Sequence, residues 1–110
     1  MSMISVSIRE SGDSFTLKVD GHAGAAEAGK DIVCAAASML TFTAAQSARF
    51  MKAENKLRRK PEFRQEQGDA ELAVKPKKAY MGEARVIFRT VLIGYLLLAQ
   101  NYPEYVQVVS

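Results

Sequence analysis

The sequence predicts a single α+β domain over residues 1–110, in which two helices pack on a largely antiparallel sheet in the order β-β-α-β-β-α-β. Two pairs of short strand-like segments and a final one are separated by two longer segments in which apolar residues recur at helical spacing. No linker divides the chain, and 110 residues fit one domain. A domain of this size gains stability from oligomerisation, because it buries only about two-thirds of its unfolded surface.

The first two segments, residues 3–9 and 14–20, predict a β-hairpin. Apolar and polar side chains alternate along both, and Gly12 between them suits a tight turn. The alternating apolar residues are Ile4, Val6, Ile8, Phe15, Leu17 and Val19. Residues 21–30 then contain three glycines and four alanines without a strand period. They predict a mobile loop whose backbone can approach a ligand closely.

A long helix is predicted to begin at Asp31, which would cap it by accepting hydrogen bonds from the amides of the first turn. The prediction rests on apolar and small residues at helical spacing, namely Ile32, Ala36, Met39, Leu40, Thr43, Ser47 and Phe50. A basic run, residues 56–60, follows as a solvated break.

The second half of the chain repeats the order of hairpin and helix. Residues 62–67 and 70–75 predict a hairpin around Gly68 and Asp69, and residues 79–101 predict a helix. One broad face of that helix carries Ala84, Ile87, Phe88, Val91, Leu92, Tyr95 and Leu98. Val86, Ile93 and Leu97 fall elsewhere on it, so a partner subunit is expected to cover a helix that is apolar nearly all round. Pro103 ends the helix, and residues 105–109 predict a closing strand.

Composition limits the class of protein. The N-terminus has no signal-peptide pattern and no apolar run approaches the ~20 residues of a membrane span, so a cytoplasmic protein without membrane contact is expected. The single cysteine forms no internal disulfide, which agrees with a reducing compartment. The net charge of +3 permits an acidic partner without requiring one.

Cys34 and His22 are the chain's only cysteine and only histidine. A helix that starts at Asp31 places Cys34 in its first turn, where free amides and the helix dipole favour a thiolate. The strand-to-loop position of His22 lets it reach that thiol, so the pair predicts nucleophilic attack on a carbonyl. The same amides would bind the oxyanion that forms. The alternatives are a buried inert thiol, a surface histidine and an Asp31 that only caps the helix.

Other chemistry fits the sequence less well. One cysteine and one histidine leave two ligands of a zinc site to ordinary carboxylates, so no metal and no cofactor is expected. Gly21, Gly24 and Gly29 match neither phosphate-binding glycine fingerprint. The basic residues 56–60, with Lys75, Lys77 and Lys78, form a candidate RNA face, although acidic residues lie between them. A non-catalytic ribosome- or RNA-associated binding module is therefore the alternative function.

One stretch resembles the signature of the ribosomal-processing cysteine protease family, Prp. The resemblance begins with Gly21-His22-Ala23 and continues, after a glycine-containing loop, with residues 31–36 (DIVCAA) and Ser38. The opening hairpin, the second helix and the segment 101–106 (NYPEYV) are also similar to the family. One position departs from its pattern, because Ala37 stands where a larger aliphatic residue is common, which affects only local packing.

This resemblance implies a cytoplasmic, homodimeric thiol endopeptidase, a hydrolase without a cofactor, that removes the N-terminal extension of large-subunit ribosomal protein number twenty-seven in ribosome biogenesis. Nucleic acid is not required for this reaction. The resemblance implies that Cys34 is the nucleophile and His22 its base, and that Gly21, Asp31 and Ser38 belong to the same motif. The loop with Gly24 and Gly29 would order around the substrate. Asp31 either caps the helix or orients His22 as a third catalytic residue, and Ser38 either donates to the site or bonds back to the carbonyl of residue 34.

Overall fold

A computed structural model describes residues 3–21, 28–66 and 68–109 of the chain. The elements follow the order that the sequence predicts, within one α+β unit of two helices and a five-stranded sheet. They are β1 (Ile4–Ser11), β2 (Ser14–Asp20), α1 (Ala28–Ala53), β3 (Glu62–Glu66), β4 (Asp69–Val74), a short 3₁₀ turn (Lys78–Tyr80), α2 (Met81–Asn101) and β5 (Val106–Val108).

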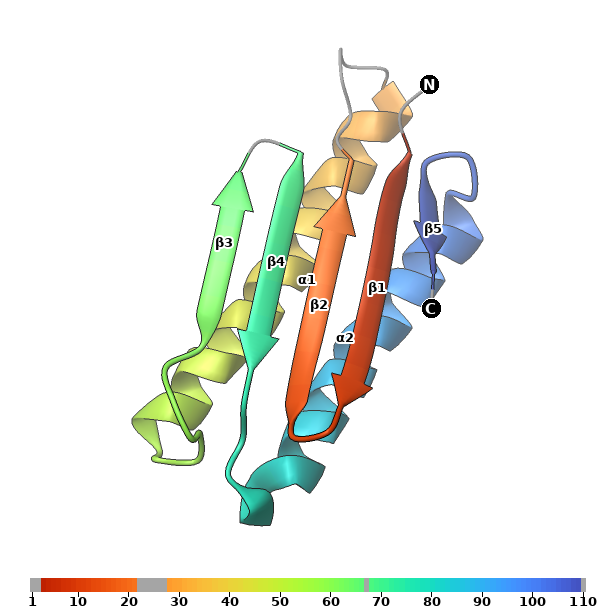
Figure 1. Ribbon diagram of the computed structural model, residues 1–110. Coiled ribbons are helices and arrows are strands. Elements are labelled where there is room, and N and C mark those ends of the chain that lie inside the picture. Colours follow the sequence, from red (N-terminus) through yellow and green to blue (C-terminus); the bar gives the residue numbers. More distant parts are fainter. Residues whose placement is uncertain (1–2, 22–27, 67, 110) are drawn as a thin grey trace.

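The sheet has the strand order β3-β4-β2-β1-β5, which the sequence does not specify (Figure 1). The pairs β1·β2, β2·β4 and β3·β4 are antiparallel, and only β5 joins β1 in parallel. The two hairpins therefore lie side by side through β2 and β4, with Phe15 opposite Val74 and Asp20 opposite Asp69. This pairing brings the start of β4 to the end of the sheet where β2 finishes.

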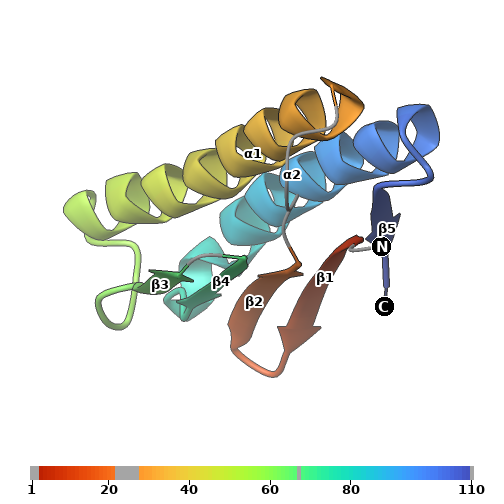
Figure 2. The ribbon, with the colours of Figure 1, turned by 90° about the horizontal axis from the view of Figure 1, so that it is seen from above.

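The molecule has two layers, with both helices on one face of the sheet (Figure 2). Alternate strand residues point into this interface, as the period of two requires. The fully buried strand residues are Ile4, Val6, Phe15, Leu17, Val19, Ala70, Leu72, Val74 and Val106. Polar residues such as Lys18 and Arg64 alternate with them and remain exposed. An antiparallel sheet with one covered face has this pattern.

The first helix differs from its prediction in two respects. It begins at Ala28 and not at Asp31, so residues 28–30 are helical and not part of a loop. The buried face carries mostly small side chains, namely Val33, Ala37, Thr41, Ala44, Ala45, Ala48 and Met51. The apolar residues that suggested the helix lie mainly on its outer side, where Ile32, Met39 and Phe50 are 59–64% exposed. Alanine gives a weak hydrophobic signal in a sequence, whereas in the fold it permits close packing.

The second helix agrees with its predicted face. Ala84, Phe88, Val91, Tyr95 and Leu98 are buried, and Val86, Ile93 and Leu97 are exposed on the outer side. The 3₁₀ turn accounts for its start at Met81, two residues later than predicted. Within the described residues, no helix is long and apolar enough to cross a membrane.

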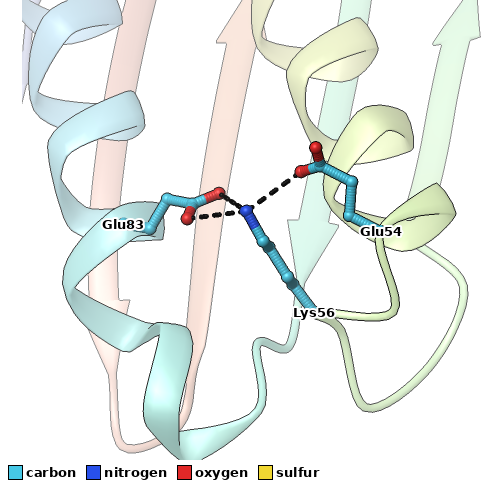
Figure 3. A network of polar contacts seen from close by, with 3 residues as sticks. All are labelled: Glu54, Lys56 and Glu83. Carbon is cyan, nitrogen blue, oxygen red and sulfur yellow. Dashed lines mark hydrogen bonds and ion pairs between the residues drawn. The ribbon is translucent and has the colours of Figure 1, made fainter.

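Lys56 links the end of α1 to the start of α2 (Figure 3). Its Nζ lies 3.0 Å from a carboxylate oxygen of Glu54 and 3.0 and 3.1 Å from the two carboxylate oxygens of Glu83, and it also lies 5.5 Å from the ring centroid of Tyr80. The hydrogen bonds to Glu83 and then to Glu54 raise the pKa of Lys56. This ion pairing fixes the loop after α1 at the end of the molecule opposite to the start of that helix (Figure 1).

Candidate active site

A cavity of about 110 Å³ lies between the first half of α1 and the adjacent end of the sheet. It is lined by the helix, by the start of β1 and the end of β2, and by the end of β3 and the start of β4 with the turn between them. Its lining residues are Ile4, Val19, Gly21, Cys34, Ala37, Ser38, Thr41, Gln65, Glu66, Gly68, Asp69 and Ala70. The cavity thus brings together Gly21, Cys34 and Ser38, three of the residues that the sequence singles out.

Cys34 and Ser38 reach the cavity because they share one face of α1. Cys34, Ala37, Ser38 and Thr41 have the spacing i, i+3, i+4 and i+7, which places them on one side of a helix. Ala37 and Thr41 on this side are buried, whereas Cys34 and Ser38 are half-buried at its margin. A thiol in this position is both held by the helix and accessible from the cavity.

Cys34 does not lie in the first turn of α1, where the sequence places it. Because the helix begins at Ala28, Cys34 lies in the second turn, where backbone amides are bonded to carbonyls four residues earlier. The amides beside this thiol are therefore not the free ones of the helix start. Asp31 lies in the first turn and is exposed, so it is not the residue that precedes and caps the helix. An anionic side chain in the first turn still interacts favourably with the helix dipole.

Gly21 joins the end of β2 to two other parts of the site. Its backbone N–H donates to the carbonyl oxygen of Gly68, with an N···O distance of 2.8 Å, so it ties β2 to the turn between β3 and β4. Its φ is +96°, and a Cβ added there would lie 2.3 Å from the carbonyl oxygen of Met3. Both the backbone conformation and the space require glycine at this position.

The remaining predicted residues are placed less completely. His22 and Gly24 lie outside the described residues, so the predicted contact between His22 and Cys34 stays a prediction. Gly29 lies in the first turn of α1, and not in a loop as predicted.

The end of β3 and the start of β4 supply a wall that the sequence does not reveal. Gln65, Glu66 and Asp69 line the cavity across from the helix. Arg64 approaches Asp69 with an N···O distance of 2.8 Å, and this hydrogen bond, followed by one with Asp20, lowers the pKa of Asp69. These residues reach the site only through the pairing of β2 with β4, which no local pattern reveals.

Thr41 and Tyr95 form a buried hydroxyl pair behind the cavity. The two hydroxyl oxygens lie within hydrogen-bond distance of each other and of the carbonyl oxygen of Ala37, which is 2.9 Å from Thr41 and 3.0 Å from Tyr95. Because each hydroxyl has a single proton, one of them donates to the other and the second donates to the carbonyl. Burial raises the pKa of Tyr95 to about 12, with the hydrogen bond to Thr41 acting in the opposite direction. Thr41 is seven residues after Cys34, and this spacing places both on one face of the helix, so the sequence contains a signal that Thr41 belongs to the site. The contact of Thr41 with Tyr95 of α2 leaves no such signal.

Two other types of site receive little support. Within residues 3–21, 28–66 and 68–109, no group of three or more His, Cys, Asp or Glu side chains could hold a metal ion. Much of the basic run is ion-paired within the chain, since Lys56 contacts Glu83, Arg58 contacts Asp13 and Arg59 contacts Glu62. The half-buried thiol beside the cavity is the reactive group of this site, because a thiolate there can attack a carbonyl of a bound molecule.

Comparison with known proteins identifies the same family from the sequence match as the motif around Cys34 resembles. The family model described as cysteine protease Prp matches residues 3–107. The ribosomal processing cysteine protease Prp of Staphylococcus aureus (strain Mu50 / ATCC 700699) is 24% identical over 104 residues, which cover 94% of this chain and 93% of that protein.

Solved structures share the fold. SMU.848 from Streptococcus mutans aligns with a TM-score of 0.71 and 24% identity, over 97% of this chain and 92% of that one. The essential ribosomal processing protease Prp from S. aureus, in complex with a substrate peptide, aligns with a TM-score of 0.68 and 22% identity, over 99% and 98% of the two chains.

The geometry of Gly21 predicts that Gly21→Ala lowers the free energy of unfolding by about 2 kcal/mol or more, because a non-glycine residue at this φ is strained and its Cβ meets backbone. Gly12→Ala is the matched control, since Gly12 has φ +59° with no atom within 4 Å of an added Cβ. We expect about 1 kcal/mol for that control, from the backbone conformation alone. Denaturant titration measures both, and equal losses would show that the contact with Met3 has no effect.

The buried Tyr95 predicts a loss of stability in alkali. Its pKa is raised to about 12 in the folded protein, so between pH 10 and 12 the unfolded chain releases this proton while the folded chain retains it. The stability contribution of Tyr95 is therefore full below pH 10 and falls by about 2 kcal/mol as the pH rises to 12. Tyr95→Phe removes this contribution. Denaturation of both proteins at pH 8 and 12 should show a smaller alkaline loss in the variant, and equal losses would contradict the assignment.

Proposed function

The chain belongs to the cysteine protease Prp family, and from that premise we propose that Cys34 is the nucleophile of a ribosomal-processing endopeptidase. The observation that carries the proposal is the half-buried thiol of Cys34 at the margin of a cavity that Ser38 and Gly21 also line. His22 serves as the base: it takes the thiol proton as the sulfur attacks the scissile carbonyl, and it returns a proton to the leaving amine. Water then hydrolyses the thioester.

The proposed substrate is the precursor of large-subunit ribosomal protein number twenty-seven, from which the enzyme removes an N-terminal extension in the cytoplasm. Support comes from the resemblance of residues 21–38 to the family signature and from the S. aureus relative, whose name describes ribosomal processing. A neighbouring structure of that protein contains a substrate peptide. An extended peptide suits a site whose mouth lies between a helix and the end of a sheet.

Supporting roles follow from position. Asp31 is exposed three residues before Cys34, where it is available to orient the imidazole of His22. Ser38 lies one turn after Cys34 on the same side of α1 and faces the same cavity, so its hydroxyl is placed to donate to a bound substrate. Gly24 lets the segment between His22 and the helix approach the peptide backbone closely, and Gly29 does the same at the first turn of α1.

We also propose that the outer face of the two helices pairs two copies of the chain. Large apolar side chains remain exposed there in a single copy, namely Ile32, Met39, Phe50, Val86, Ile93 and Leu97. A groove between the helices, lined by Met39, Leu40, Gly94 and Leu97 among others, runs along the same face. Contiguous exposed apolar surface of this kind marks an interaction site, and a self-complementary pairing about a two-fold axis would cover it in both copies.

Cys34→Ala is expected to abolish cleavage of a peptide that spans the junction between the extension and the mature ribosomal protein. The fold should survive, because alanine fits the space of a half-buried cysteine. Mass spectrometry of the peptide and thermal unfolding of the protein measure the two effects. Ala35→Ser is the control, since Ala35 is the next residue and is exposed.

The outcomes separate two parts of the proposal. Unchanged turnover in Cys34→Ala would remove the catalytic role of this thiol. If the wild-type protein cuts other peptides but leaves the junction peptide intact, the substrate is wrong while the protease activity stands.

Ile93→Asp or Leu97→Asp is expected to convert dimers into monomers, because each would place a carboxylate in the proposed interface. Both side chains are about half exposed, 51% and 53%, so the monomer should remain folded. Ser7→Asp is the control, with its new carboxylate opposite Lys18 on the other face of the sheet. Sedimentation velocity at several concentrations measures the result. Dimers that persist in both helix variants would place the interface elsewhere.

A further inference from the structure

We propose that the cavity beside Cys34 receives the substrate side chain next to the cleaved bond, and that Thr41, held in place by Tyr95, closes this pocket and limits the size of that side chain. The inference rests on the proposed function, because it takes Cys34 as the nucleophile. Thr41 is thereby assigned the role of limiting side-chain size, and Tyr95 the role of positioning Thr41.

The pocket extends along α1 from the thiol to Thr41. The two residues are seven positions apart on one face of the helix, so their backbones are separated by about 10 Å along its axis. Ala37 and Ser38 line the helical wall between them. A side chain whose own carbonyl lies at Cys34 would therefore point along this wall toward Thr41.

The character of the walls changes with depth. Ile4, Val19 and Ala70 line the cavity from the sheet and are at least 92% buried, with Ala37 facing them from the helix. Polar residues of the cavity, Gln65 and Glu66, are exposed at the end of β3 and so lie toward its mouth. The deeper part is suited to an apolar side chain. The whole cavity, at about 110 Å³, is smaller than the ~150 Å³ cavity that holds benzene in another protein, so the size of the bound side chain is constrained.

The closed end is fixed by hydrogen bonds across the two helices. Thr41 is 4% exposed, and its hydroxyl is bonded to the carbonyl oxygen of Ala37 and to the hydroxyl of Tyr95, which is fully buried. Within the described residues, no buried side-chain nitrogen or oxygen lacks a hydrogen-bond partner, so this pair is satisfied without a ligand. Because Tyr95 belongs to α2, movement of Thr41 would disturb the packing of both helices, and an oversized side chain would meet a rigid wall.

The test measures covalent labelling of Cys34 by a series of peptidyl chloromethyl ketones. In this reaction the sulfur displaces chloride to form a thioether, so its rate does not depend on completing peptide hydrolysis. The series carries Val, Leu, Phe or Trp at the residue next to the ketone. Thr41→Ala is expected to raise the ratio of the Trp to the Val labelling rate at least tenfold, since one or two methylene equivalents in a pocket are worth about 10–200-fold in discrimination.

Three further variants isolate the role of Thr41. Ala70→Val adds volume to the opposite wall and should lower the same ratio at least tenfold. Thr41→Val keeps the volume but loses the hydroxyl and with it the tie to Tyr95. The ratio should therefore rise about threefold to tenfold, as in Tyr95→Phe and less than in Thr41→Ala. Thr43→Ala is the matched control, because Thr43 also donates to the carbonyl four residues earlier, at 2.6 Å, but is exposed and does not line this cavity.

Tyr95→Phe tests the positioning role. Loss of its hydroxyl should free Thr41 and relax the size limit, so that the Trp to Val ratio rises about threefold to tenfold. Rates with iodoacetamide, which carries no side chain, should remain within twofold of wild type. A purely structural role would instead change the labelling rates of all reagents together.

The outcomes distinguish this inference from the proposed function. If Thr41→Ala and Ala70→Val both leave the ratio within twofold of wild type, the pocket assignment is overturned, even when the wild type cleaves the junction peptide. If Thr41→Ala does not fold, the ratio of Ala70→Val decides alone. If the ratios shift as expected but no peptide is hydrolysed, Thr41 still limits the side chain that the cavity binds beside Cys34, while the protease assignment fails.

Discussion

The packing of the buried side of α1 against the sheet and α2 is the constraint on which the site depends. Its buried side is made of alanines, with Val33 and Met51 toward its ends and Thr41 as the only buried polar residue among those described. Small side chains let the helix backbone lie close to its neighbours, above all to α2, and Tyr95 of α2 is hydrogen-bonded to the hydroxyl of Thr41 that this packing buries. Cys34 occupies the edge of this side, where the contact with the sheet ends and the cavity begins. The helix therefore fixes the thiol without sealing it from solvent.

The second constraint is the pairing of the two hairpins. Because β2 pairs with β4, the turn between β3 and β4 reaches the same end of the sheet as Gly21, and the hydrogen bond from Gly21 to Gly68 holds the two together. One wall of the cavity is thus built from residues more than thirty positions after Cys34. The opposite end of the molecule carries the ion pairs of Lys56 and much of the positive charge, so the reactive and the strongly basic regions are well separated.

The sequence predicts which segments form helices and strands better than it predicts which side of α1 is buried. Apolar and polar side chains alternate around Val6 and Leu17 because only one face of the sheet is covered, and this alternation predicts the strands. The broad apolar face around Tyr95 predicts α2. The start of α1 was placed three residues late because Asp31 is a good capping residue, whereas the helix extends back through Ala28. Its buried side was not identified because Met39 and Phe50 give a stronger apolar signal than alanine does. These larger residues lie on the outer face.

The site was predictable only where its parts are close in sequence. Cys34 and Ser38 share a helical face, and their spacing alone places them together. Glu66 and Asp69 join them through strand pairing, which is a property of the whole chain and leaves no local pattern. The tie between Thr41 and Tyr95 likewise depends on how two distant helices pack, although each residue has an ordinary place in its own helix.

The most direct test is a crystal structure of the protein with a peptidyl chloromethyl ketone bound covalently. Our account predicts a thioether at Cys34, an imidazole nitrogen of His22 within about 4 Å of the sulfur, in line with the reach of a general base, and the adjacent side chain in the cavity against Thr41. A structure in which the imidazole of His22 lies far from the labelled sulfur, with no other base beside it, would contradict the proposed chemistry.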